Sequence, residues 1–373
     1  MKKSRQNIKP EWAPGDSGSE FATYVVPGLD SEQTNISPKK QSGAKAPDIA
    51  ALGQGVLDKD RTVLARAITL IESNSPKHFD KAQALLRELL PYTGNSLRIG
   101  ITGPPGVGKS TFIESFGVYL CKLGHRVAVL AIDPTSSLTK GSIMGDKTRM
   151  EKLAADKNAF IRPSPSGGAL GGVARKTREA ALLCEAAGFD IILIETVGVG
   201  QSEITVRSMV DFYILMLLPG SGDELQGIKK GVVEIADLLV VNKAEGDNLL
   251  PARLTAEQYR QALHYLQPAT QGWQTDAISI SALNETGIET VWNITENFLE
   301  AAKTGGVFES RRRNQTLNWF YSLAEEEIIS KFYNTPGIKE LTESLKSKIL
   351  SGEMPSTQAV RIVTDEFFGG GNH

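Results

Sequence analysis

Residues 97–111 read Leu-Arg-Ile-Gly-Ile-Thr-Gly-Pro-Pro-Gly-Val-Gly-Lys-Ser-Thr, and this stretch decides the fold. Apolar residues alternate over its first five positions and predict a short buried strand. The pattern Gly-x-x-x-x-Gly-Lys-Ser follows at 103–110, and apolar residues at helical spacing continue from Phe112 to Leu120. A strand, a glycine loop and a helix in this order predict a loop whose backbone N–H groups surround a phosphate chain at a helix N-terminus.

The residues of this loop have separate expected roles. Its glycines allow positive φ angles and a close approach of the backbone to the ligand. Lys109 is expected to reach the β- and γ-phosphates of a nucleotide, and Ser110 to bind Mg²⁺. The alternative, a glycine-rich turn with a chance lysine, leaves the flanking strand and helix unexplained. The predicted nucleotide-binding residues here are Gly103, Gly106, Val107, Gly108, Lys109, Ser110 and Thr111.

Charge and composition argue against several classes of protein. The 373 residues carry a formal net charge of -2 with both signs mixed, which gives no electrostatic argument for a nucleic-acid or membrane partner. We find no signal peptide and no apolar stretch of membrane length, so we expect a soluble cytoplasmic protein. Cys121 and Cys184 lie in apolar helical patterns, which predicts buried thiols in a reducing compartment.

Hydrophobic patterning divides the chain into four predicted segments. Residues 1–55 are poor in apolar side chains and predict a flexible tail. Residues 56–95 contain two amphipathic helices, the first capped by Asp58 or Asp60, and predict a helical hairpin that either braces the next domain or binds a partner. Residues 96–304 form the predicted nucleotide domain, and residues 305–368 form a helical segment.

The nucleotide domain is predicted to be of the α/β class. Strand and helix patterns alternate through it, which indicates a largely parallel sheet covered by helices on both faces. Ligands bind such sheets at the carboxyl ends of the strands. The predicted strands are 97–102, 126–132, 158–162, 190–195, 211–218, 236–242 and 276–281.

Two acidic residues stand at predicted strand ends. Asp133 follows strand 126–132, and Glu195 ends strand 190–195. Carboxylates at this edge are suited to hold Mg²⁺ beside the phosphate loop, although each alone could be an ordinary strand-end residue. Glu195 begins the sequence Glu-Thr-Val-Gly, whose Gly198 is expected to contact the γ-phosphate through its N–H.

The sequence Asn-Lys-Ala-Glu at 242–245 follows the strand at 236–242. It resembles the guanine-reading motif Asn-Lys-x-Asp, whose acid accepts hydrogen bonds from guanine N1–H and the exocyclic amine. Here the acid is Glu245, which leaves guanine selectivity open, and Asp247 is an alternative acceptor. Predicted contacts to the base come from Asn242, Lys243, Glu245 and, in the last base-side loop, from Ser281, Ala282 and Leu283.

The segment after residue 305 is helical and rich in apolar residues. We interpret the run Arg311-Arg312-Arg313 at its start as a solvated helix face. The apolar stripe that follows needs a partner, which favours a role in dimerisation.

Four motifs in this order resemble the MeaB/ArgK family of P-loop GTPases, over residues 58 to about 350. They are the phosphate loop, Asp-Pro-Thr-Ser at 133–136, Glu-Thr-Val-Gly-Val-Gly-Gln-Ser-Glu at 195–203, and Asn-Lys-Ala-Glu at 242–245. Three further stretches, at 145–150, 163–168 and 219–231, make the resemblance specific.

The resemblance implies a G-protein chaperone of adenosylcobalamin-dependent acyl-CoA mutases, of which methylmalonyl-CoA mutase is one. GTP or GDP and Mg²⁺ would be its ligands, and hydrolysis would gate the loading, protection and reactivation of the mutase. The family is implied to be homodimeric through its C-terminal helices. Which acyl-CoA mutase is the partner stays open.

The resemblance also implies roles for single residues. Lys109, Glu195 and Gln201 would serve catalysis, with Gln201 a weak candidate for positioning the water. Ser110, Asp133, Asp146 and Glu195 would surround Mg²⁺. The residues expected to couple the nucleotide state to the partner are Asp223, Glu224 and Lys229.

Three other functions remain open. A nickel-type metallochaperone GTPase needs a ligand cluster, but the histidines and cysteines are scattered along the sequence. An ATP-dependent kinase of a transport protein conflicts with Asn242 and Lys243, which favour guanine. A nucleotide-sensing scaffold without turnover would require that Glu245 or Gln201 has abolished hydrolysis.

Overall fold

The computed structural model describes residues 48–132, 150–163, 170–196, 202–220 and 230–369. The chain divides into two units, Met1–Asp48 and Ile49–His373, and every element described below belongs to the second. Among the described residues, no helix is both long enough and apolar enough to cross a bilayer.

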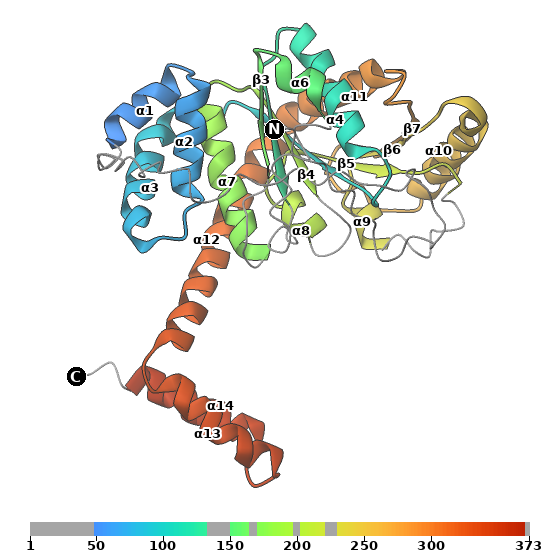
Figure 1. Ribbon diagram of the computed structural model, residues 1–373. Helices are drawn as coiled ribbons and strands as arrows, with labels where there is room; N and C mark the ends of the chain where they lie inside the picture. Colours follow the sequence, from blue (N-terminus) through green and yellow to red (C-terminus); the bar gives the residue numbers. More distant parts are fainter. Residues whose placement is uncertain (1–47, 133–149, 164–169, 197–201, 221–229, 370–373) are drawn as a thin grey trace, which may run out of the picture. The chain divides into compact units, whose positions relative to one another are not determined.

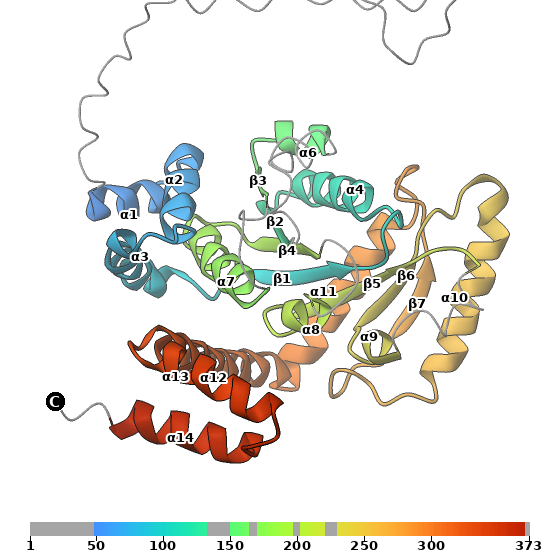
Figure 2. The same cartoon turned by 60° about the horizontal axis from the view of Figure 1, so that its bottom comes forward.

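Seven parallel strands form one sheet in the order β3-β2-β4-β1-β5-β6-β7 (Figures 1 and 2; all seven strands are labelled in Figure 2). All seven predicted strands are confirmed, and their ends differ from the prediction by at most two residues. Every residue of β1 and its neighbours β4 and β5 is buried, as expected for parallel strands covered on both faces. The strands are β1 (Leu97–Thr102), β2 (Val127–Ile132), β3 (Ala159–Arg162), β4 (Ile191–Thr196), β5 (Phe212–Leu217), β6 (Leu238–Val241) and β7 (Asp276–Ser279).

Helices cover both faces of the sheet, and each face has its own hydrophobic core. On one face, α4 (Lys109–Lys122), α6 (Glu151–Ala155) and α11 (Ile288–Thr304) pack on the side chains of Ile99 and Ile101. The opposite core is formed with α7 (Leu170–Ala186), α8 (Ser202–Arg207), α9 (Lys230–Glu234) and α10 (Leu249–Leu263), the last preceded by the 3₁₀ turn η4 (Gly246–Asn248). The β1–α4 connection at the centre of the sheet therefore carries the predicted phosphate loop.

The N-terminal helices pack beside α7 (Figures 1 and 2). They are α1 (Ile49–Leu57), α2 (Arg61–Ile71) and α3 (Pro76–Leu89), followed by the turn η2 (Leu90–Tyr92). Asp60 caps α2 by accepting hydrogen bonds from the N–H groups of Thr62 and Val63. An ion pair between Arg162 on β3 and Glu72 after α2 supports the bracing role.

Helix α1 lies mostly within the segment that the sequence predicts to be a flexible tail. Its nine residues include two glycines, which lower helix propensity. The helix forms because it packs on α2 and α3, where Val56 is fully buried. Tertiary packing thus decides a segment whose own propensity is weak.

Both cysteines are buried and unbridged, as predicted. Burial is the main cause that raises the pKa of the Cys121 thiol to about 11, and burial also raises the pKa of Cys184. Neither thiol is therefore reactive at neutral pH.

Three helices form the C-terminal segment: α12 (Val307–Asn334), α13 (Ile338–Leu350) and α14 (Ser356–Gly369). Helices α13 and α14 pack on each other around a small core that includes Ile338 and Val363. Helix α12 leaves several large apolar side chains exposed, namely those of Leu317, Phe320, Tyr321, Ile328, Ile329 and Tyr333.

The interpretation of the arginine run as a solvated helix face is wrong for two of its three residues. The side chain of Arg312 is only 16% exposed and donates to both carboxylate oxygens of Asp211, at 2.8 and 2.7 Å. Arg311 donates to the backbone carbonyl of Asp211 and to the hydroxyl of Thr270. Only Arg313 is exposed. Asp211 directly precedes β5, and its carboxylate is buried. A buried carboxylate is costly without a cationic partner, which explains why Arg311 and Arg312 pack against Asp211.

We predict that Arg312→Ala lowers the free energy of unfolding by about 3 to 5 kcal/mol, because it leaves the carboxylate of Asp211 buried and unpaired. Urea unfolding measures the change. The control is Arg313→Ala, which removes the same side chain from the next, exposed position and should change stability by less than about 0.5 kcal/mol. Equal losses in the two variants would contradict the structural role of Arg312.

Candidate functional site

The predicted phosphate loop lies at the carboxyl end of β1 and leads into α4. Gly103 has a φ angle of 149°, and a Cβ atom there would lie 2.5 Å from the carbonyl oxygen of Met216. Gly108 has a φ angle of 92°. Glycine is therefore required at both positions. Because the first N–H groups of a helix have no acceptor within it, the N-terminus of α4 can bind an anion.

Lys109 is folded onto this loop. Its ammonium donates to the carbonyl oxygens of Gly103 at 2.8 Å and Pro104 at 3.2 Å, and the residue is 8% exposed. Burial lowers the pKa of Lys109, and the nearby carboxylate of Glu195 partly opposes that shift. A phosphate chain in the loop would give this cation a much stronger partner than the two neutral carbonyl groups.

Ser110 and Glu195 meet beside the loop. The Ser110 hydroxyl lies 3.5 Å from a carboxylate oxygen of Glu195, which stands near the end of β4 and is 6% exposed. The next residue, Thr196, donates from its hydroxyl to that of Thr102 at 2.8 Å and so fixes the end of β4 against the end of β1. A hydroxyl and a carboxylate side by side are hard oxygen ligands and fit Mg²⁺.

Asn242 connects the phosphate loop to the last base-side loop. Its amide nitrogen donates to the carbonyl oxygen of Val107 at 2.9 Å, and its amide oxygen accepts from the N–H of Ala282 at 3.0 Å. The residue is 2% exposed. Ser115 on α4 supports the same loop by donating to the carbonyl oxygen of Ala282 at 2.7 Å. The sequence did not reveal Ser115, because this contact spans 167 residues.

Glu245 is partly buried, and one of its carboxylate oxygens is completely buried with no hydrogen-bond partner among the described residues. Such an acceptor is costly to leave unpaired, so the geometry fits a ligand that donates there. Guanine has two adjacent donors, at N1 and at the exocyclic amine. The alternative acid, Asp247, is exposed.

The other residues that are predicted to contact the base differ in their exposure to solvent. Lys243 has a φ angle of 64°, and the backbone N–H of Ala244 donates to the carbonyl oxygen of Ile280 at 2.9 Å. Ser281 is buried, whereas Leu283 is 71% exposed. The backbone of the last base-side loop is thus held in place while the side chain of Leu283 points to solvent.

Printed contacts bring together the phosphate loop, Glu195, Asn242 and Ala282. The structure also describes the other predicted base-side residues, Lys243, Glu245, Ser281 and Leu283. The remaining predicted residues lie outside the described part of the chain, and their roles stay predictions. These residues are Asp133, Asp146, Gly198, Gln201, Asp223, Glu224 and Lys229.

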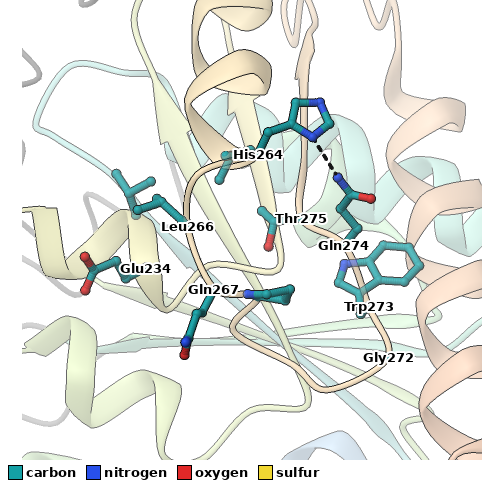
Figure 3. A pocket seen from close by; sticks show the side chains of 11 residues that line it. Glu234, His264, Leu266, Gln267, Gly272, Trp273, Gln274 and Thr275 are labelled. Carbon is teal, nitrogen blue, oxygen red and sulfur yellow. Dashed lines mark hydrogen bonds between the residues drawn. The ribbon is translucent and has the colours of Figure 1, made fainter.

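Two cavities lie at the opposite, amino-terminal edge of the sheet. One, of about 420 Å³, is lined by the segments that precede β6 and β7 and includes Trp273 (Figure 3). His264 and Gln274 approach each other at its wall, with 3.3 Å between Nδ1 and Nε2. The second, of about 500 Å³, lies between α8 and α12. Neither cavity contains a predicted site residue.

The described residues also contain no ligand cluster of the kind that a nickel metallochaperone needs. In that part of the chain, no three His, Cys, Asp or Glu side chains are grouped so that they could hold a metal ion.

Comparisons with known proteins agree on one family. The sequence model of the family described as "Methylmalonyl Co-A mutase-associated GTPase MeaB" matches residues 64–337. A protein of Caulobacter vibrioides named "Putative GTPase" is 51% identical over 84% of this chain and 96% of its own length. The mouse protein "Methylmalonic aciduria type A homolog, mitochondrial" is 43% identical over 84% of this chain and 78% of its own. "GTPase ArgK" of Escherichia coli is 42% identical over 87% and 98%.

A solved structure has the same fold. The crystal structure of a "LAO/AO transport system kinase" is 35% identical, with a TM-score of 0.71, over 86% of this chain and 97% of its own. Because the family match and these relatives each span most of the chain, this protein is a P-loop GTPase that belongs to the MeaB family.

Proposed function

We propose that this GTPase is a chaperone of an adenosylcobalamin-dependent acyl-CoA mutase of the methylmalonyl type. In this role, GTP hydrolysis gates the loading, protection and reactivation of the mutase. The observation that carries the proposal is the buried acceptor oxygen of Glu245, three residues after the Asn242 side chain that is hydrogen-bonded to the phosphate loop, because such an acceptor favours guanine. The mutase is proposed from the family description and from the resemblance of the motifs.

The chemistry of hydrolysis needs positioning and charge neutralisation more than covalent steps. Lys109 and the N–H groups at the start of α4 would bind the β- and γ-phosphates. Ser110 and Glu195, together with Asp133 and Asp146, would hold Mg²⁺, whose charge stabilises the phosphate oxygens. The hydrogen bond from Thr196 to Thr102 fixes the carboxyl end of β4. Gly198 and Gln201 follow this strand end directly in the sequence.

Partner coupling is proposed for the segment between β5 and α9, where Asp223, Glu224 and Lys229 lie. The γ-phosphate and Mg²⁺ would hold these residues in one arrangement, and hydrolysis would release them. Slow hydrolysis by the protein alone is expected if the mutase must complete the catalytic arrangement.

The guanine pocket is tested by Glu245→Gln, which keeps the side chain's size but replaces an acceptor oxygen by a donor. We expect GDP affinity to fall about 100-fold, equivalent to about 2.7 kcal/mol. Asp247→Asn is the matched control and should leave GDP affinity within about threefold, because Asp247 is exposed. Titration calorimetry with GDP and ADP gives the affinities. Equal losses in the two variants, or equal binding of ADP by the unchanged protein, would refute the assignment.

The chaperone role is tested by GTP and ATP turnover with Mg²⁺, alone and with each candidate acyl-CoA mutase. We expect slow GTP hydrolysis that rises at least about tenfold with the correct mutase, equivalent to about 1.4 kcal/mol of barrier. Lys109→Ala should abolish both rates. Equal use of ATP would instead favour the kinase alternative, and the lack of acceleration by any mutase would exclude the proposed partner class.

We also propose that α12 forms a homodimer, since Leu317, Phe320, Tyr321 and Ile328 are exposed at helical spacing on it. Sedimentation should show a dimer at micromolar concentration, and the double substitution Phe320→Lys with Ile328→Lys should yield monomers, because charges replace the apolar contact. Glu326→Lys, on the same helix but at a polar exposed position, is the control and should stay dimeric. A monomeric unchanged protein would contradict the proposal.

A further inference from the structure

The cavity between α8 and α12 is also lined by residues 269–271. Because α8 precedes β5 and residues 269–271 precede β7, it lies on the edge of the sheet opposite the nucleotide site. Asp237, at the start of β6, anchors this region and is 0% exposed. The cavity is bounded by the last residue of α8 and by the first three turns of α12. The polar side chains that line it include those of Arg207, Thr270, Ser310, Arg311, Asn314 and Gln315.

Two arginines share one carboxylate in this wall. Arg207 on α8 donates to both oxygens of Asp237, at 2.7 and 3.2 Å, and Arg311 on α12 has a nitrogen 3.8 Å from the same carboxylate. The hydroxyl of Thr270 contacts both guanidinium groups. Two cations and one anion leave a local excess of one positive charge. Burial lowers the pKa of Arg311 and repulsion from Arg207 lowers it further, while attraction by the carboxylates of Asp237 and Asp211 opposes the shift.

Neighbouring ion pairs do not supply the missing negative charge. Arg312 is paired with Asp211 at 2.7 Å, and Arg98 is paired with Glu185 at 2.8 Å. Each of these acids is only 1% exposed and already faces its own arginine. The excess charge of Arg207 and Arg311 is therefore available to a ligand.

We propose that this cavity binds the oxyanion group, a phosphate or a carboxylate, of a small molecule, with Arg207 and Arg311 as its cationic ligands. A guanidinium has five N–H donors in a planar arrangement that matches such groups. Arg207 bonds to Asp237 and Thr270, and Arg311 bonds to Thr270 and the backbone of Asp211, so each guanidinium has more donors than these bonds use. The start of α12 adds the positive end of a helix dipole.

The size of the cavity and its lining suit an anionic metabolite rather than a bare ion. About 500 Å³ exceeds the volume of one phosphate and lies within the range of small-molecule sites. Asn314 and Ser310 offer neutral polar groups to the rest of such a molecule. Because the site connects α8, which follows β4 of the nucleotide site, with the base of α12, a bound anion would stabilise the attachment of that helix.

The test uses the full chain saturated with Mg²⁺ and a non-hydrolysable GTP analogue, so that the phosphate loop is already occupied. Inorganic phosphate and malonate are titrated separately by calorimetry, against sodium chloride at the same ionic strength. Binding of phosphate alone identifies a phosphate site, binding of malonate alone a carboxylate site, and binding of both a general oxyanion site. Each of these results supports the proposal only if the variants below behave as expected.

Ser310→Glu introduces a carboxylate into the cavity and should weaken anion binding at least tenfold. Ser322→Glu makes the same change at an exposed position of α12 outside the cavity and should bind as the unchanged protein does. Arg311→Gln should abolish binding, but it also removes an anchor of α12, so Ser310→Glu is the decisive variant. No binding of either anion, or equal binding by the two serine variants, would overturn the proposal.

Discussion

The geometry of the nucleotide site depends on one buried amide, that of Asn242. It joins the phosphate loop to the last base-side loop through contacts that span 135 and 40 residues of sequence. Both ends of the amide are hydrogen-bonded, so its burial costs little. The hydrogen bond from Ser115 on α4 to the carbonyl oxygen of Ala282 supports the same arrangement. Through these hydrogen bonds, the phosphate-binding and base-binding halves of the site form one preorganised unit at the carboxyl edge of the sheet.

The opposite edge of the sheet is organised by buried carboxylates. Asp211 and Asp237 precede β5 and β6, and each requires a cation because a buried, unpaired charge is costly. Arg207, Arg311 and Arg312 supply these cations from α8 and α12. The same requirement therefore fastens the C-terminal helix to the nucleotide domain. It also links α8, which follows β4 in the sequence, to the start of that helix, because Arg207 and Arg311 approach the same carboxylate of Asp237.

Much of the fold could be predicted because parallel strands covered on both faces appear as apolar runs. All seven strands were found in this way, and the strand-loop-helix order at residues 97–122 located the phosphate site. Helix α1 escaped prediction, since its stability comes from packing on α2 and α3. The burial of Arg311 and Arg312 escaped it too, because Asp237 precedes Arg311 by 74 residues and Asp211 precedes Arg312 by 101 residues.

The sequence by itself determined the phosphate loop, the residues at the strand ends and the α/β class, because these follow from local periodicity and from backbone requirements such as those of Gly103. The tertiary structure decided the order of the strands and the burial of a carboxylate oxygen of Glu245 where Asp247 is exposed. It also decided the pairing of α8 with α12 at Asp237. These features depend on contacts between distant segments, and such contacts leave no periodic signal along the chain.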